Sequence, residues 1–169
     1  MDIFVVNSEV NSGLPPISDL RKQIIEDAAF FYATILLNPR TVKKLVLDIA
    51  LVPDMDVKGE CINEDGTKKS RWFTINLCDD GTEDPIQTLA HEMVHVKQYV
   101  KNELYKPKQS LHKGGQKTEA YWKGKPWKPK AREHPYFDAP WEIIAFGREV
   151  GLYSRWISFY KDNYEGEYL

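Results

Sequence analysis

Near the start of the chain, the spacing of apolar residues predicts a strand, a helix and a second strand. Residues 1–7 alternate loosely between apolar and polar side chains, which is typical of a strand. Over residues 19–37, apolar side chains recur every three or four positions after a potential cap at Ser18, so we expect an amphipathic helix. The expected core stripe of this helix is Leu20, Ile24, Ala28, Phe31 and Ile35. Residues 45–52 form a mostly apolar run, which favours a buried strand.

The next part of the chain predicts a β-hairpin. Two segments with strand-like composition, 57–63 and 70–77, flank the turn-like residues 64–67, Glu-Asp-Gly-Thr. We expect Trp72–Leu77 to be an edge strand that comes just before the next helix. Residues 79–82, Asp-Asp-Gly-Thr, then break the sheet.

The second half of the chain predicts two helices separated by an irregular segment. Asp84 and Pro85 suit the N-cap and the first position of a helix that ends near residue 104. Residues 105–138 contain repeated Gly and Pro, which predicts a long irregular segment with a short hairpin around 121–124. A last helix is expected over about 140–160. Its expected core stripe is Ile143, Phe146, Val150, Tyr153 and Ile157.

Together these elements predict one α+β domain over residues 1–169, with a small mixed sheet and the segment 105–138 as an insertion. Cys61 and Cys78 are too few and too far apart for a disulfide framework or a CxxC metal pair. The first residues lack the features of a secretory signal, and no apolar run approaches the length that spans a membrane. We therefore expect a cytoplasmic protein that does not enter a membrane.

The candidate chemistry lies in the second predicted helix, in the sequence His91-Glu92-Met93-Val94-His95. Residues four apart share one face of a helix, so the two imidazoles point to one location and can bind Zn²⁺ at about 2.0–2.1 Å. Glu92 lies beside that location, where its carboxylate can accept a proton from a metal-activated water and pass it to a leaving amine. The apolar residues around the motif favour a buried helix over a solvated one.

Composition adds an uneven distribution of charge to this picture. The chain of 169 residues carries a net charge of −2, but nine Lys or Arg and only two Glu lie between Tyr105 and Glu133. This basic arm (residues 105–133) therefore carries nine minus two, or +7, and the remainder carries −9. Exposed cations interleaved with aromatic rings suit binding to nucleic acid. Two alternatives stay open: a loop whose tryptophans cover the active-site cleft, and a basic rim that favours acidic peptides.

Residues 88–98, Thr-Leu-Ala-His-Glu-Met-Val-His-Val-Lys-Gln, resemble the active-site helix of the zincin metallopeptidases, especially small SprT-like and bacteriophage-encoded members. The similarity is sharp over about 82–104 and 140–149, and elsewhere extends only to the order of the elements. It implies a zincin-like fold, an edge strand that binds extended peptide, and zinc-dependent hydrolysis of a peptide or protein substrate with Glu92 as the general base. A phage origin would place the protein in the cytoplasm of a bacterial host.

A catalytic zinc site needs a third protein ligand and an open position. Glu142 is the first choice, because residues 140–145, Pro-Trp-Glu-Ile-Ile-Ala, resemble the Glu-x-x-Ala element of the glutamate zincins. In that element the glutamate completes the site and the small residue lets two helices approach. SprT-like proteins proper use a third histidine instead, so His134 and His112 remain alternatives.

Other residues are candidates for supporting roles. Glu149 lies seven residues after Glu142 on the same helix face, from which it could hydrogen-bond a ligand histidine. A developing oxyanion needs a hydrogen-bond donor, and Tyr136, Tyr121 and Arg148 are available for that role.

Two functions follow from the sequence. The first is a zinc-dependent peptidase in which His91, His95 and Glu142 bind Zn²⁺. The second is a non-catalytic protein with a zincin scaffold that binds nucleic acid or a protein partner through the basic arm. Glu92 argues against the second, because a purely structural metal site does not need that carboxylate.

Overall fold

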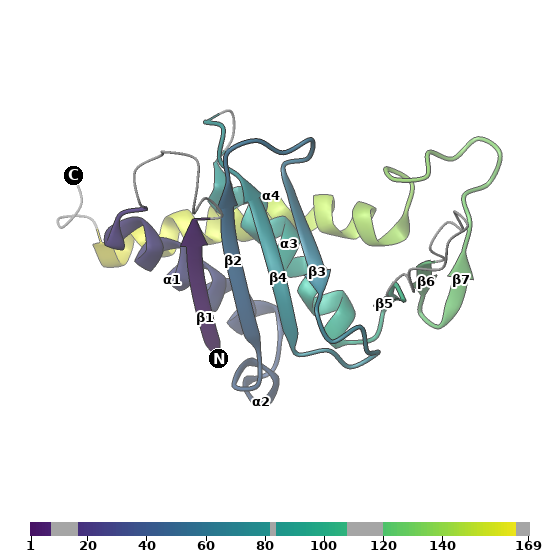
Figure 1. Ribbon diagram of the computed structural model, residues 1–169, viewed down its shortest axis with the longest axis horizontal. Helices are drawn as coiled ribbons and strands as arrows, with labels where there is room; N and C mark the ends of the chain where they lie inside the picture. Colours follow the sequence, from purple (N-terminus) through teal and green to yellow (C-terminus); the bar gives the residue numbers. More distant parts are fainter. Residues whose placement is uncertain (8–16, 82–83, 108–119, 165–169) are drawn as a thin grey trace.

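A four-stranded mixed sheet forms the centre of the fold (Figure 1). The computed structural model describes residues 1–7, 17–81, 84–107 and 120–164. The strands of the central sheet are β1 (Asp2–Asn7), β2 (Val46–Val52), β3 (Gly59–Asn63) and β4 (Trp72–Cys78). Their spatial order is β1-β2-β4-β3, in which β1, β2 and β4 are parallel and β3 is antiparallel to β4.

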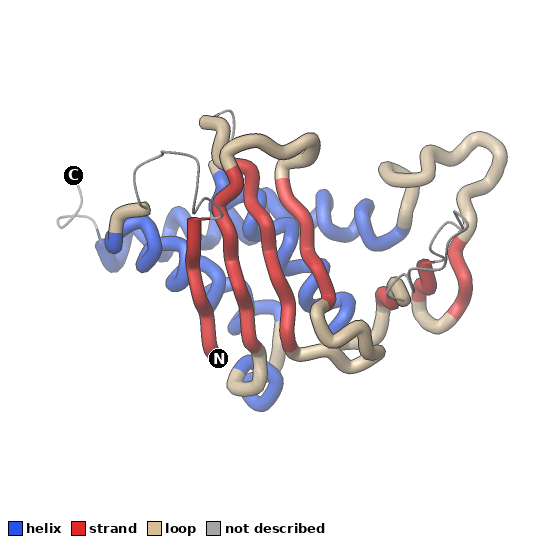
Figure 2. The backbone as a smooth tube through the Cα atoms, viewed as in Figure 1, coloured by secondary structure: helices blue, strands red, loops and turns tan. Residues whose placement is uncertain are grey.

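Helices cover one face of this sheet and leave the other face open (Figures 1 and 2). The helices of the described residues are α1 (Asp19–Leu36), α2 (Pro39–Val42), α3 (Pro85–Val100) and α4 (Pro140–Tyr164). α3 packs against α1 and α4 on its sides and against β3 and β4 beneath it. The predicted α+β class with a small mixed sheet is confirmed at this level.

α1 forms where the apolar spacing predicts it, and its cap is also confirmed. The Ser18 hydroxyl accepts a hydrogen bond from the backbone N–H of Arg21 at 3.2 Å. The expected core stripe is wrong at Leu20, which is 41% exposed, whereas Ala28 is fully buried. The residues of α1 that are buried are Ile25, Ala28, Ala29, Tyr32, Ala33 and Leu36.

The expectation that Trp72–Leu77 forms an edge strand is wrong. β4 pairs with β2 on one side and with β3 on the other, so β3 is the edge strand beside α3. The hairpin itself is confirmed, because Gly59 pairs with Leu77 and Asn63 pairs with Phe73. The physical reason for the error is non-local: β4 pairs with β2, whose residues lie twenty-six positions earlier in the chain, and that pairing covers its second edge.

The expected core stripe of α4 is also wrong in part. Ile143, Phe146 and Val150 are 55%, 42% and 58% exposed, although all three are apolar. The buried residues of α4 are Trp141, Glu142, Ala145, Leu152 and Trp156, and α4 packs mainly against α3. Packing against α3 therefore uses the face that carries Glu142 and leaves a row of apolar side chains in solvent.

The segment predicted as irregular contains a second, three-stranded sheet. Its strands are β5 (Leu104–Tyr105), β6 (Ala120–Trp122) and β7 (Lys125–Trp127), which pair antiparallel in that order. The predicted hairpin near 121–124 is confirmed, with Lys123 and Gly124 at φ of 49° and 79° in its turn. α3 ends at Val100 rather than near residue 104, because Asn102 adopts a φ of 55° and β5 begins at Leu104.

Two further expectations concern the whole chain. Within the described ranges, no helix combines the length and the apolar character that a membrane crossing requires. Cys61 and Cys78 are both free thiols, on the neighbouring strands β3 and β4.

Candidate metal centre

His91, Glu92 and His95 lie in the middle of a helix that is buried on nearly all sides. α3 begins after Asp84, whose carboxylate accepts a hydrogen bond from the backbone N–H of Ile86 at 2.9 Å. Because the sheet, α1 and α4 enclose the helix, His91, Glu92 and His95 are only 6%, 4% and 7% exposed. The prediction that the motif lies on a buried, capped helix is confirmed.

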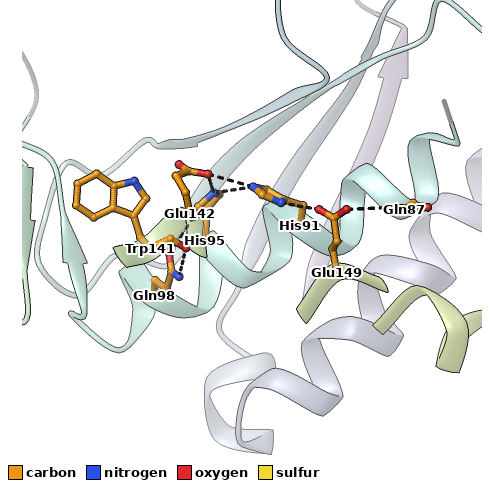
Figure 3. Close-up of polar contacts among 7 residues, drawn as sticks. All are labelled: Gln87, His91, His95, Gln98, Trp141, Glu142 and Glu149. Carbon is orange, nitrogen blue, oxygen red and sulfur yellow. Dashed lines mark hydrogen bonds and ion pairs between the residues drawn. The ribbon is translucent and has the colours of Figure 1, made fainter. Parts of the chain in front are cut away.

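Glu142 joins the two histidines from the first turn of α4 (Figure 3). Its Oε2 atom lies 3.3 Å from His91 Nε2 and 3.4 Å from His95 Nε2, and the two Nε2 atoms are 3.2 Å apart. Glu142 is 3% exposed. These three side chains form a buried group that could hold a metal ion.

The approach of Glu142 depends on close packing between α3 and α4. Ala145, one turn after Glu142, is fully buried at this helix contact. A larger side chain there would push the helices apart, because packed interiors tolerate added volume poorly. The small residue that the sequence shows three positions after Glu142 therefore has a packing role.

The outer nitrogen of each histidine has its own partner. His91 Nδ1 lies 2.8 Å from Glu149 Oε2, and since a carboxylate only accepts, the proton of His91 is on Nδ1. His95 Nδ1 lies 2.9 Å from Gln98 Oε1. The amide nitrogen of Gln98 donates to the carbonyl of Trp141 at 2.9 Å, which leaves its oxygen for His95. When the rings are neutral, both imidazoles therefore turn an unprotonated Nε2 toward Glu142.

Three hydrogen-bond acceptors thus converge in a buried space, an arrangement that requires a positive charge between them. Burial lowers the pKa of His91, but the hydrogen bonds that its protonated form makes to Glu142 and Glu149, together with the charge of Glu92, outweigh burial and raise that pKa. Burial raises the pKa of Glu142, but its hydrogen bonds with His91 and His95 outweigh burial and hold that pKa well below the usual range. The centre stabilises a cation or a proton.

The spacing of the three atoms fits a specific coordination geometry. Ligands that each lie about 2.0–2.1 Å from a tetrahedral zinc ion are separated by about 3.3–3.4 Å. The observed separations of 3.2, 3.3 and 3.4 Å match this spacing closely. Two imidazole nitrogens and one carboxylate oxygen are also a donor set that zinc accepts, with a fourth position left over.

Glu92 differs from the other carboxylates of the centre. It is 4% exposed, and among the described residues it has no hydrogen-bond partner. Burial raises its pKa, and the nearby His95 and His91 partly oppose that rise. A Cβ atom on Gly59 would lie 2.9 Å from Glu92 Oε1, so the glycine lets the edge strand β3 approach the carboxylate.

Glu92 and His91 open onto a cleft of about 620 Å³ between β3, α3 and α4. A cleft of this size is typical of sites for small molecules or short peptide segments. His95 and Glu142 are not part of its lining.

The structure separates the remaining candidates. Tyr136 lines the cleft, and burial, followed by the negative charge of Glu142, raises the pKa of its hydroxyl. Arg148 is exposed on α4 and does not line the cleft. Tyr121 lies on β6, where its ring packs near that of Tyr105. Glu149 lies where the sequence predicts, beside His91.

Neither alternative third ligand, His134 or His112, is found at the metal centre among the described residues. His134 is exposed, and its Nδ1 accepts hydrogen bonds from the backbone N–H groups of Tyr136 and Phe137 at 3.1 and 3.2 Å. Its ring therefore serves the turn before α4. His112 lies outside the described residues.

Sequence reasoning missed Gln98 and Gly59. Gln98 lies three residues after His95, and that spacing places the two side chains on one helix face, so a local signal was available. Gly59 is thirty-three residues before Glu92 on a strand, and nothing in the sequence links the two. No protein-family model matches the chain, and neither a curated protein nor a solved structure shows significant similarity to it.

Proposed function

We propose that this protein is a zinc-dependent peptidase with a zincin-like fold, in which His91, His95 and Glu142 bind the metal. The observation that carries the proposal is the buried group of three ligand atoms with mutual separations of 3.2–3.4 Å. The antiparallel edge strand β3 beside α3, together with a second helix that supplies Glu142, agrees with the resemblance to the glutamate zincins.

Zinc in such a site acts as a Lewis acid that polarises a carbonyl group and makes water more acidic. Glu92 is the general base: its carboxylate takes a proton from the water whose oxygen attacks the scissile carbonyl carbon. It then gives that proton to the amide nitrogen as the carbon–nitrogen bond breaks. Glu92 is buried at the cleft, has no hydrogen-bond partner among the described residues, and has room beside Gly59, so its carboxylate suits this transfer.

Tyr136 is the proposed donor to the developing oxyanion. It lines the cleft, and the charge of Glu142 acts on its hydroxyl. Because burial and the nearby carboxylates raise its pKa, the phenol keeps its proton at neutral pH and can donate. Arg148 is not favoured for this role, since it does not line the cleft.

The test is a cleavage assay on an unstructured protein such as casein. Zinc-loaded wild type should produce peptide fragments, and a chelator should stop the reaction. Glu92→Gln should keep about one zinc per chain and lose activity by about 10²–10⁴-fold, because only the proton transfer is removed. Glu26→Gln, on α1, is the matched control and should stay active. A wild type that carries zinc and cleaves nothing would contradict the proposal.

A second, compatible proposal is that the basic arm binds nucleic acid. Lys123, Lys125, Lys130 and Arg132 are exposed on and after the β6–β7 hairpin. Base stacking is less favoured than phosphate contact, because Trp127 and Trp122 pack on Trp141 with ring centroids 5.0 and 6.3 Å away. Binding to single-stranded DNA should weaken steeply with salt and after charge reversal at Lys123 and Lys125. Absence of binding at low salt would remove this proposal.

A further inference from the structure

The cleft beside Glu92 has an apolar wall that remains open to solvent. Val57, Tyr136, Phe137 and Phe146 line it and are 53%, 46%, 59% and 42% exposed. Val57 comes from the turn before β3, whereas the three aromatic residues come from the turn before α4 and from α4 itself. Two separate parts of the chain therefore present large apolar side chains to one cavity. Exposed apolar surface of this kind marks a binding site more often than a chance feature.

The aromatic part of the wall begins at the candidate metal centre. The ring of Phe146 lies 4.6 Å from that of His91, and the ring of Phe137 lies 6.3 Å from that of Phe146. Tyr136 packs at 5.2 Å from Phe137. An apolar group that contacts these rings would therefore lie next to the atoms that we propose to react.

The charged residues of the lining also favour an apolar side chain over an acidic one. Apart from His91 and Tyr136, its ionisable residues are three carboxylates and one amine. They are Asp84, Glu92, Glu149 and Lys58. None of the described cations of the basic arm belongs to the lining. An acidic side chain that entered the cleft away from the metal would meet like charge and lose water, and both effects oppose its binding.

We infer that the cleft selects peptide segments with a large, uncharged apolar side chain next to the bond that is cut, and that Phe137 is the main contact for that side chain. The inference rests on the proposed peptidase function and specifies its substrate. Phe137 has the most exposed ring of the wall, at 59%, and unlike Phe146 it does not pack on His91. Ile143 and Val150 extend the exposed apolar surface along α4, where neighbouring apolar residues of the same segment can bind.

Fluorescein-labelled hexapeptides of the form Gly-Gly-X-X-Gly-Gly, with X as Phe, Ala or Glu, test the inference by binding and by turnover. Binding is measured by fluorescence anisotropy on Glu92→Gln, and turnover on the zinc-loaded wild type. The X = Phe peptide should bind at least about tenfold more tightly than X = Ala, the effect expected from burying one large apolar side chain, and X = Glu should bind least. In Phe137→Ala the preference for Phe over Ala should fall by about tenfold. Phe30→Ala, which removes a ring that is 51% exposed on α1, should leave it unchanged.

The outcomes separate the inference from the peptidase proposal. Cleavage without a preference for Phe, or a preference that Phe137→Ala does not reduce, overturns the inference and leaves the peptidase proposal standing. Absence of cleavage with Phe-selective binding that depends on Phe137 overturns the peptidase proposal and supports the apolar recognition. Equal or absent binding of all three peptides overturns the inference whatever the turnover shows.

Discussion

His95 and His91 belong to one candidate metal centre but lie in different surroundings. On the closed side, His95 is held by Gln98, which is fully buried and also bonded to the carbonyl of Trp141. On the open side, His91 lines the cleft together with Glu92 and with its own partner Glu149. Figure 3 shows the two sides meeting at Glu142.

The difference indicates that the closed side determines metal affinity and the open side determines turnover. Buried groups with complete sets of hydrogen bonds fix geometry, so the closed side should determine how tightly a metal binds. The open side has access to solvent and to a substrate, and it contains Glu92, whose buried carboxylate has no hydrogen-bond partner among the described residues. Substitutions on the two sides should therefore separate metal affinity from turnover.

The largest effect is expected at the ligand that joins both sides. Glu142→Ala removes the carboxylate of the ligand group, and zinc affinity should fall by more than about 100-fold, beyond what loss of an outer hydrogen bond causes. Competition with a chromophoric chelator measures the change. His134→Ala is the matched control, because His134 lies in the turn before α4 and should not affect zinc. If His134→Ala weakened zinc and Glu142→Ala did not, the assignment of the third ligand would be wrong.

A smaller effect is expected from the partners of the histidines, and it should be unequal. Gln98→Leu leaves His95 without its acceptor inside the closed side, so zinc affinity should drop by about 10–100-fold. Gln87→Leu removes a hydrogen bond of 3.2 Å to Glu149 on the open side, one step further from the metal. Zinc affinity should therefore fall by no more than about threefold. Equal effects in the same titration would argue against the difference between the two sides.

Gly59→Ala should act on the open side alone. The added Cβ would lie 2.9 Å from Glu92 Oε1 and 2.7 Å from Thr88 Cγ2, and both side chains are buried, so Glu92 has to move. Because a small displacement of a catalytic group slows the reaction, kcat/KM should fall by about tenfold or more while zinc affinity stays constant. Gly151→Ala is the control, since a Cβ there meets nothing within 4 Å. A loss of zinc in Gly59→Ala would instead mean that the two sides are coupled.

The smallest effect is expected at the sheet β5-β6-β7. Trp127 packs edge-on against Trp141, whose carbonyl accepts the hydrogen bond of Gln98. Trp127→Ala should lower the free energy of unfolding by about 1–2 kcal/mol, less than for a fully buried tryptophan, and weaken zinc only a few-fold. Thermal melts and the chelator assay measure both quantities. Trp72→Ala, on the open face of the central sheet, should leave zinc affinity unchanged. If Trp72→Ala weakened zinc as much as Trp127→Ala does, the effect would come from general destabilisation and not from the contact with Trp141.

The parts of the fold and site that could be predicted are those with local signals. Helix periodicity and the caps at Ser18 and Asp84 depend on neighbouring residues, and so does the placement of His91 and His95 on one face. Glu142 was predicted only through the resemblance of residues 140–145, because no local rule connects α4 to α3. The contact between Gly59 and Glu92 depends on which strand lies at the sheet edge, and that order was predicted wrongly.

The error in α4 has a different origin. Ile143, Phe146 and Val150 follow a helical apolar pattern, and such a pattern normally marks the core face. Here that face borders the cleft and solvent, while the core face carries the polar Glu142. Local rules fail most often at functional sites, where exposed apolar residues and buried carboxylates serve binding and chemistry.

The most direct test of the central claim is a crystal structure of the zinc-loaded protein with anomalous diffraction recorded on both sides of the zinc absorption edge. The account predicts a single strong anomalous peak between His91 Nε2, His95 Nε2 and Glu142 Oε2, at about 2.0–2.2 Å from each atom. A peak coordinated by other residues, or no peak from protein saturated with zinc, would contradict it.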